Sequence, residues 1–192
     1  EYTSGKDYSF STTNSLINNL KKSPSKRQTN PNEFRHKGRA IRQCSSAISQ
    51  GLNPAWLTEA TLVPVPPSKA KTDPEYDDRI LQVCNGIAAP TPIDVRELVV
   101  QKQTIRAAHE CDPGERPTVD EIADNFVIDE AVAAPAPKVL GIVDDVLTAG
   151  RHFKAMQRIL QNRFPGVPIV GIFIARRIFP NDAFADFDAI EF

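Results

Sequence analysis

The stretch that decides the fold is Val139 to Phe153, with the sequence VLGIVDDVLTAGRHF. Its first five residues are apolar or small, which is typical of a short strand buried on both faces of a parallel sheet. The run ends at Asp144 and Asp145, and a turn of small residues, Thr148-Ala149-Gly150, follows. We therefore expect a strand, an acidic pair, a tight loop and then an amphipathic helix, whose apolar face is Phe153, Met156, Ile159, Leu160 and Phe164.

Such a junction has the chemistry to bind a phosphorylated sugar. The first N–H groups of a helix have no partner within the helix and carry partial positive charge, so a phosphate binds there if small side chains let it approach. Thr148 and Gly150 allow that approach, and Arg151 and His152 would add donors. Ionised carboxylates only accept hydrogen bonds, so the two aspartates suit ribose hydroxyls or a hydrated Mg²⁺ ion.

The run resembles the phosphoribosyl-pyrophosphate (PRPP) signature of type I phosphoribosyltransferases: four apolar residues, two acids, two further residues and Thr-Thr-Gly-x-Thr. The resemblance implies an α/β fold, a parallel sheet flanked by helices with a small hood. It also implies that Asp144 and Asp145 hold the ribose hydroxyls, with Mg²⁺ bound indirectly, and that residues 148–152 cradle the 5-phosphate. Ala149 and His152 depart from the pattern, because hydroxyl residues are usual at both positions.

Other nucleotide-binding folds have less support. An apolar strand that ends in two acids is also typical of the Walker B strand of NTPases, but the chain has no GxxxxGK[ST] loop and no GxGxxG fingerprint. Within the resembling family, enzymes that salvage 6-oxopurines carry an Asp at the first position of the phosphate loop. Thr148 stands there, which favours the ComF-like, orotate or amidophosphoribosyltransferase-like branches.

A second anion-binding loop is expected after a short strand at Leu62 to Val65. Pro66-Pro67-Ser68-Lys69 follows that strand, and Val-Pro-Val-Pro is similar to the ComF-like competence branch. The resemblance implies that Ser68 and Lys69 bind pyrophosphate with help from Arg79, and that Asp144 and Asp145 complete the catalytic set. The alternative for Lys69 is an ordinary solvated loop residue.

The remaining chain is predicted to alternate helices and strands. We expect helices from about Ser11, over Glu33 to Gln50 and over Pro74 to Ala88. The expected strands are Val95 to Val100, Phe126 to Ile128 and Ile169 to Ala175, and Ser23 to Asn32 is expected to be a loop. The charged stretch from Gln101 to Val119 corresponds to the family's hood, where the resemblance places Lys102, Arg106, His109 and Arg116 near the pyrophosphate.

Charge is concentrated near the N-terminus. Between positions 21 and 42 there are eight basic residues and one acid, or +7, against −1 for the whole chain. Such a region favours nucleic acid or a nucleic-acid-binding partner, although a solvated helix face is the alternative and only Phe34 is near for base stacking. The basic residues are Lys21, Lys22, Lys26, Arg27, Arg35, Lys37, Arg39 and Arg42.

Composition fits one α/β core preceded by a helical extension. We expect a basic N-terminal region over residues 1–55 and a phosphoribosyltransferase-like domain over 56–192. Three scattered cysteines favour neither a zinc site nor a disulfide framework. No apolar run approaches a bilayer span and the N-terminus lacks a signal-peptide layout, so a cytoplasmic protein without membrane contact is expected, with a homodimer left open.

Three functions remain open from the sequence. The first is an active phosphoribosyltransferase that joins PRPP to an unidentified nitrogen acceptor. The second is a PRPP- or nucleotide-binding module without catalysis that acts in regulation or in bacterial defence, for example beside a retron, with nucleic acid. Ala149, His152 and the basic region favour this second function. The third is a nucleotide-hydrolysing effector on the same scaffold.

Overall fold

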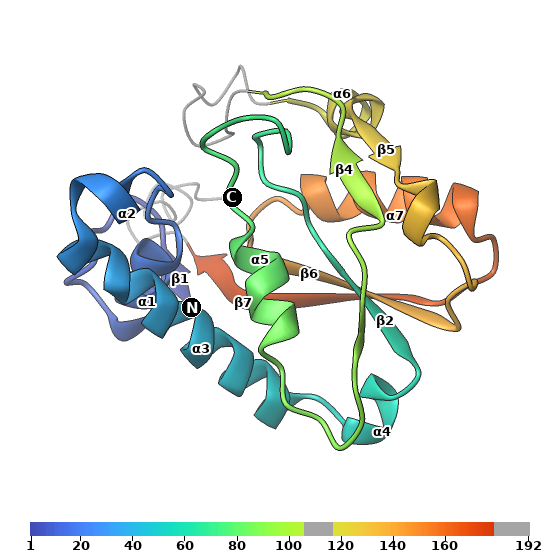
Figure 1. Cartoon of the computed structure of the whole chain (residues 1–192), viewed down its shortest axis with the longest axis horizontal. Helices are drawn as coiled ribbons and strands as arrows, with labels where there is room; N and C mark the ends of the chain where they lie inside the picture. Colours follow the sequence, from blue (N-terminus) through green and yellow to red (C-terminus); the bar gives the residue numbers. More distant parts are fainter. Residues whose placement is uncertain (106–116, 179–192) are drawn as a thin grey trace, which may run out of the picture.

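The computed structural model describes residues 1–105 and 117–178. Five parallel strands form one sheet in the order β1-β7-β6-β2-β3 (Figure 1). The parallel sheet flanked by helices that the sequence predicts is therefore confirmed. The strands are β1 (Tyr2–Thr3), β2 (Ala60–Pro64), β3 (Asp94–Val95), β6 (Val139–Leu147) and β7 (Ile169–Ile178).

Helices cover both faces of this sheet. The face of α3 and α5 buries residues such as Leu62, Val143 and Ile172, whereas α6 and α7 cover Val63, Leu140 and Ile142. Because both faces of β2 and β6 are covered, each strand is a nearly continuous apolar run, as parallel sheets require. The helices are α1 (Thr12–Leu20), α2 (Lys26–Thr29), α3 (Pro31–Gly51), α4 (Pro54–Leu57), α5 (Arg79–Asn85), α6 (Val119–Asn125) and α7 (Arg151–Arg163).

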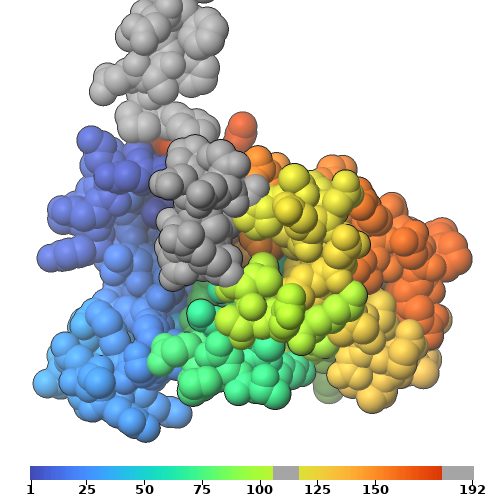
Figure 2. All heavy atoms as spheres, turned by 90° about the horizontal axis from the view of Figure 1, so that it is seen from above, coloured from blue at the N-terminus to red at the C-terminus, as the bar shows by residue number. Residues whose placement is uncertain are grey.

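Residues 1–55 share the core of the sheet. β1 adds an edge strand to β7, and Ala40, Ile41 and Cys44 of α3 pack in the same buried cluster as Leu62 of β2. In Figure 2 the blue N-terminal region and the green residues after β2 form one continuous surface. The expected boundary at residue 55 therefore does not separate two cores, because burial of α3's apolar face depends on the sheet.

A small second layer lies beside the main sheet. β4 (Val99–Gln101) pairs antiparallel with β5 (Phe126–Ile128), and α6 and a short 3₁₀ helix (η1, Glu130–Val132) flank β5. This is the place expected for the hood. Lys102 donates a hydrogen bond to the carbonyl of Asp124, whereas Arg106, His109 and Arg116 lie outside the described residues.

Several expected boundaries were wrong. Residues 95–100 form two strands because β3 pairs with β2 whereas β4 pairs with β5. The helix expected from Pro74 begins only at Arg79, and the loop expected at 23–32 contains α2 and the start of α3. Most important for the site, β6 does not end before its acids, since pairing with β7 continues to Leu147.

No helix in the described parts of the chain is both long enough and apolar enough to cross a bilayer.

Candidate functional site

The two expected anion loops follow neighbouring strands. β2 and β6 pair in parallel from Ala60 opposite Val139 to Pro64 opposite Val143, so their carboxyl ends lie at one edge of the sheet. The chain after β2 continues through α5 to β3, whereas the chain after β6 continues through α7, on the opposite face, to β7. The connections diverge between β2 and β6, which is the position where open α/β sheets bind ligands.

The acidic pair lies where β6 loses its β2 neighbour. The last bond between the two segments joins the Val65 N–H to the Val143 carbonyl, at 2.9 Å. Pro66 and Pro67 follow and have no N–H with which to extend the ladder. Asp144 and Asp145 therefore belong to β6 but occupy the part of it that is paired on the β7 side only.

The loop of residues 148–150 has the expected shape. Thr148 and Ala149 are exposed, and Gly150 has a positive φ of 72°, a conformation that glycine adopts without steric cost. Gly150 is the N-cap of α7 and provides no side chain to accept from the first turn. By contrast, α1, α3 and α6 are capped by Ser11, Asn30 and Thr118. The loop therefore leaves open the end of a 13-residue helix.

The two basic residues after this loop are less available than the sequence implied. Arg151 donates from Nη1 to the Pro117 carbonyl, just before α6, at 3.2 Å. His152 is partly buried, and burial lowers its pKa below the usual value, so the imidazole is neutral at neutral pH. Backbone N–H groups, rather than these two side chains, are the main donors that the loop offers.

Asp145 is held by two cations of the protein. Its side chain is only 8% exposed, and its Oδ2 accepts from Arg79 Nη2 at 2.9 Å and from Nε at 3.2 Å. Its Oδ1 lies 3.1 Å from Lys21 Nζ. Burial alone would raise the pKa of Asp145, but Lys21 and Arg79 outweigh it and lower the pKa, so the carboxylate stays ionised.

Asp144 has a different environment. It is half-buried, and its Oδ1 accepts the backbone N–H of Asp145 at 2.8 Å. Burial, and then the charge of Asp145, raise the pKa of Asp144 well above its ordinary value. From the sequence, we expected the same role for the two aspartates. In the structure, however, Asp144 is more exposed than Asp145. Asp145 would bind a ligand only if Lys21 or Arg79 moved away from its carboxylate.

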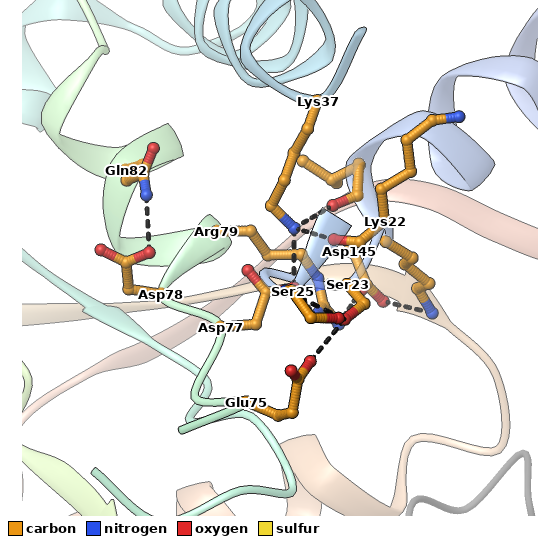
Figure 3. A network of polar contacts seen from close by, with 12 residues as sticks. Lys22, Ser23, Ser25, Lys37, Glu75, Asp77, Asp78, Arg79, Gln82 and Asp145 are labelled. Atoms are coloured by element: carbon orange, nitrogen blue, oxygen red, sulfur yellow. Dashed lines mark hydrogen bonds and ion pairs between the residues drawn. The ribbon is translucent and has the colours of Figure 1, made fainter. Parts of the chain in front are cut away.

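Figure 3 shows the network that surrounds Asp145. Asp77 joins it through Oδ2, which accepts from Arg79 Nη1 at 2.8 Å and from Lys37 Nζ at 2.7 Å. Lys37 also donates to the carbonyls of Leu20 and Lys22, at 2.9 and 2.7 Å. These carbonyls flank Lys21, so the buried Lys37 positions the residue that contacts Asp145.

The loop after β2 is braced by Thr104 and Ile105, which follow β4. The Ser68 carbonyl accepts from the Ile105 N–H at 2.9 Å, and the Ala70 N–H donates to Thr104 Oγ1 at 3.0 Å. Lys69 is half-buried in this loop. Ser68 and Lys69 thus lie on the loop after β2, as predicted, and Arg79 contacts Asp145 of the acidic pair.

The basic residues do not form a single patch. Lys37 was expected to be part of a nucleic-acid surface, and that prediction is wrong because it is only 3% exposed. Lys21 pairs with Asp145, while Lys22 and Lys26 pair with Glu33. Arg27 lies over the Phe34 ring. Arg35, Arg39 and Arg42 are exposed on α3.

Sequence reasoning missed Asp77 and the role of Lys37. Position 37 lies in the helical stripe of Ile41, Cys44 and Ile48, so a lysine there indicated a buried charge that needs a partner. No comparable signal marked Asp77.

No model of a known protein family matches this chain, and no curated protein matches it at a significant level.

The donor set fits an Mg²⁺ ion only in part. Within residues 1–105 and 117–178, no group of three or more His, Cys, Asp or Glu side chains is arranged so that it could hold a metal ion. Arg79 and Lys21 already balance Asp145. The two aspartates alone would supply few of the six oxygen ligands that Mg²⁺ prefers, so waters or groups of another molecule would have to supply the rest.

Proposed function

We propose that this protein binds PRPP with Mg²⁺ and transfers its phosphoribosyl group to a nitrogen acceptor, with release of pyrophosphate. One observation carries the proposal. The loops after β2 and β6 follow neighbouring strand ends at one edge of the sheet, and Asp144 and Asp145 lie at that edge. One loop offers an open helix end and the other offers Ser68 and Lys69. PRPP carries a phosphate at C5 and a pyrophosphate at C1, so each of the two loops would bind one of its charged groups.

In this proposal each group has one task. The N–H groups around Gly150 hold the 5-phosphate, and the Thr148 hydroxyl adds a donor. The carboxyl oxygens of Asp144 accept hydrogen bonds from the ribose hydroxyls. Lys69, with Ser68, faces the pyrophosphate, and Mg²⁺ bound to the substrate would neutralise charge on that leaving group.

The reaction is a displacement at C1. The bond from C1 to the pyrophosphate oxygen breaks and pyrophosphate leaves with the electron pair. The acceptor nitrogen forms the new bond to C1 through an oxocarbenium-like state and then loses its proton to solvent. No covalent intermediate on the protein is needed, so the chain's residues act by positioning the sugar and balancing charge.

Lys21 gives the proposed site a resting state. While Lys21 and Arg79 occupy both oxygens of Asp145, that carboxylate has no free charge for a ribose or a metal-bound water. The side chain of Lys21 is 39% exposed, so solvent weakens its ion pair. Arrival of Mg²⁺ and PRPP would therefore displace Lys21 and leave the better-enclosed Arg79 in place.

The second candidate function is a PRPP- or nucleotide-binding module without turnover. The specific observation in its favour is that Asp145 is fully engaged by protein cations. Ala149 in the phosphate loop and the neutral imidazole of His152 also reduce the donors available for the phosphate. Such a module would act as a regulator, for example in bacterial defence, through ligand-dependent contacts.

Two measurements separate these functions. Calorimetry with PRPP and Mg²⁺ tests binding, and pyrophosphate release with a panel of purine, pyrimidine and amide acceptors tests transfer. Binding with turnover supports the transferase, and binding without turnover on any acceptor supports the second candidate. Absence of PRPP binding at millimolar concentration contradicts both. Asp144→Asn with Asp145→Asn is the matched variant, and its affinity should fall below detection.

A further inference from the structure

Helix α3 carries a stripe of arginines on its outer face. Arg35, Arg39 and Arg42 are separated by four and three residues, the spacing that places side chains on one side of a helix. All three are exposed. In the described ranges of the chain, no acidic side chain forms an ion pair with any of them. The stripe is thus a local positive surface on a chain whose net charge is −1.

A groove of about 790 Å³ runs beside this stripe, between α3 and α5. Arg42 belongs to both features, because its Nη1 lies over Gly38, which also lines the groove. Gly86 and Ser45, which both line the groove, pack closely against each other, since a Cβ on Gly86 would lie 2.6 Å from Ser45 Oγ. The walls carry hydroxyl and amide groups from Ser46, Ser49, Gln50, Gln82 and Asn85.

We propose that this surface binds single-stranded nucleic acid, with phosphates on the three arginines and a base in the groove. A rise of about 1.5 Å per residue places Arg35 and Arg42 about 10 Å apart along α3. The long side chains of the three arginines can extend from this stripe, so they can contact up to three successive phosphates of one strand. Guanidinium groups bind phosphate through two parallel hydrogen bonds. Amide side chains, such as that of Asn85, match the donor and acceptor edges of bases.

The surroundings of the stripe favour this partner over other polyanions. An anionic membrane surface would need apolar residues beside the arginines, but the apolar side of α3 faces the core through Ile41, Cys44 and Ile48. A duplex cannot place a base in a side groove without unpairing it. An acidic protein segment without aromatic residues would supply charge but no flat ring for the groove.

This surface is separate from the proposed PRPP site. The groove lies along the flanks of α3 and α5, whereas Arg79 at the start of α5 faces the acids. The inference does not depend on the proposed function, and either can fail alone.

The test is fluorescence anisotropy with a labelled single-stranded oligonucleotide of about 12 nucleotides. Three phosphate contacts predict a slope of about −2 in log affinity against log salt, or about a 20-fold loss between 50 and 200 mM. Arg35→Gln, Arg39→Gln and Arg42→Gln together should abolish most of that slope and lower affinity at least ten-fold. The matched control removes three exposed lysines elsewhere, Lys6→Gln, Lys138→Gln and Lys154→Gln, and should lose less than three-fold.

Three further probes complete the test. An abasic strand of equal length should bind more weakly than the base-bearing strand, and the matching duplex should bind more weakly than the single strand. Polyglutamate should compete poorly. Equal loss in the two triple variants, no detectable binding at 50 mM salt, equal affinity for the abasic strand, preference for the duplex, or efficient competition by polyglutamate would each overturn the proposal. Circular dichroism of both variants verifies that they are folded.

Discussion

Lys37→Met removes the buried ammonium that links the N-terminal helices to the site. Lys37 is 3% exposed and donates to the Asp77 carboxylate and to two backbone carbonyls. Methionine retains most of the apolar stem but cannot donate, so Asp77 keeps only Arg79 and the carbonyls of Leu20 and Lys22 lose their charged donor. Breaking a buried ion pair on one side costs about 3–5 kcal/mol. At about 2–4 °C per kcal/mol for a chain of this size, the melting temperature should fall by about 6–20 °C.

The matched control is Lys26→Met. Lys26 also pairs with a carboxylate, Glu33, but the two side chains are 40% and 33% exposed. Its loss should cost less than about 1 kcal/mol. Thermal unfolding followed by circular dichroism measures both variants. A melting temperature for Lys37→Met within about 2 °C of the wild type, or an equal effect of the two substitutions, would refute the argument that the buried network anchors the N-terminal region.

Three other predictions concern the site itself. Lys21→Met frees one oxygen of Asp145, so affinity for PRPP with Mg²⁺ should rise by up to about five-fold in calorimetry; a large loss of affinity would instead show that Lys21 binds the ligand. The pKa of Asp144 is raised to about 7 by burial and then by Asp145, so the folded state keeps a proton that the unfolded chain loses, and stability falls as pH rises from about 4 to 7. Asp144→Asn should therefore melt at least about 3 °C above the wild type at pH 8, with the gap narrowing toward pH 4; a gap that does not change with pH contradicts this. Gly150→Ala should cost about 1–2 kcal/mol because φ is +72°, and Gly150→Asn should cost less, while a neutral Gly150→Ala would contradict the left-handed turn.

Local features of the fold were predictable from the sequence. The strand, loop and helix of residues 139–163 are encoded by contiguous residues, since the apolar run, the small turn residues and the helical spacing each depend on near neighbours. The same holds for β7 and α3. The parallel pairing of β2 and β6 was predictable because both strands are mostly apolar, which is typical of strands covered on both faces.

Contacts between distant residues were not predictable in this way. Arg79 and Asp145 are 66 residues apart, and Lys37 and Asp77 are 40 apart. No periodic pattern relates them, because side chains converge only after the sheet has formed. The division of residues 94–101 between two sheets has the same origin, since the change of strand partner depends on segments that are distant in the sequence.

The most direct test of the central claim is the affinity of the 148–150 loop for the phosphate of PRPP. Ala149 is exposed, so Ala149→Asp adds a negative charge at the open end of α7 without disturbing the core, and Ala149→Asn adds nearly the same shape without the charge. Calorimetry with PRPP and Mg²⁺ should give an affinity for the Asp variant at least ten-fold below that of the Asn variant. Equal affinities in the two variants, with the wild type binding, would mean that the phosphate lies elsewhere and would contradict the account.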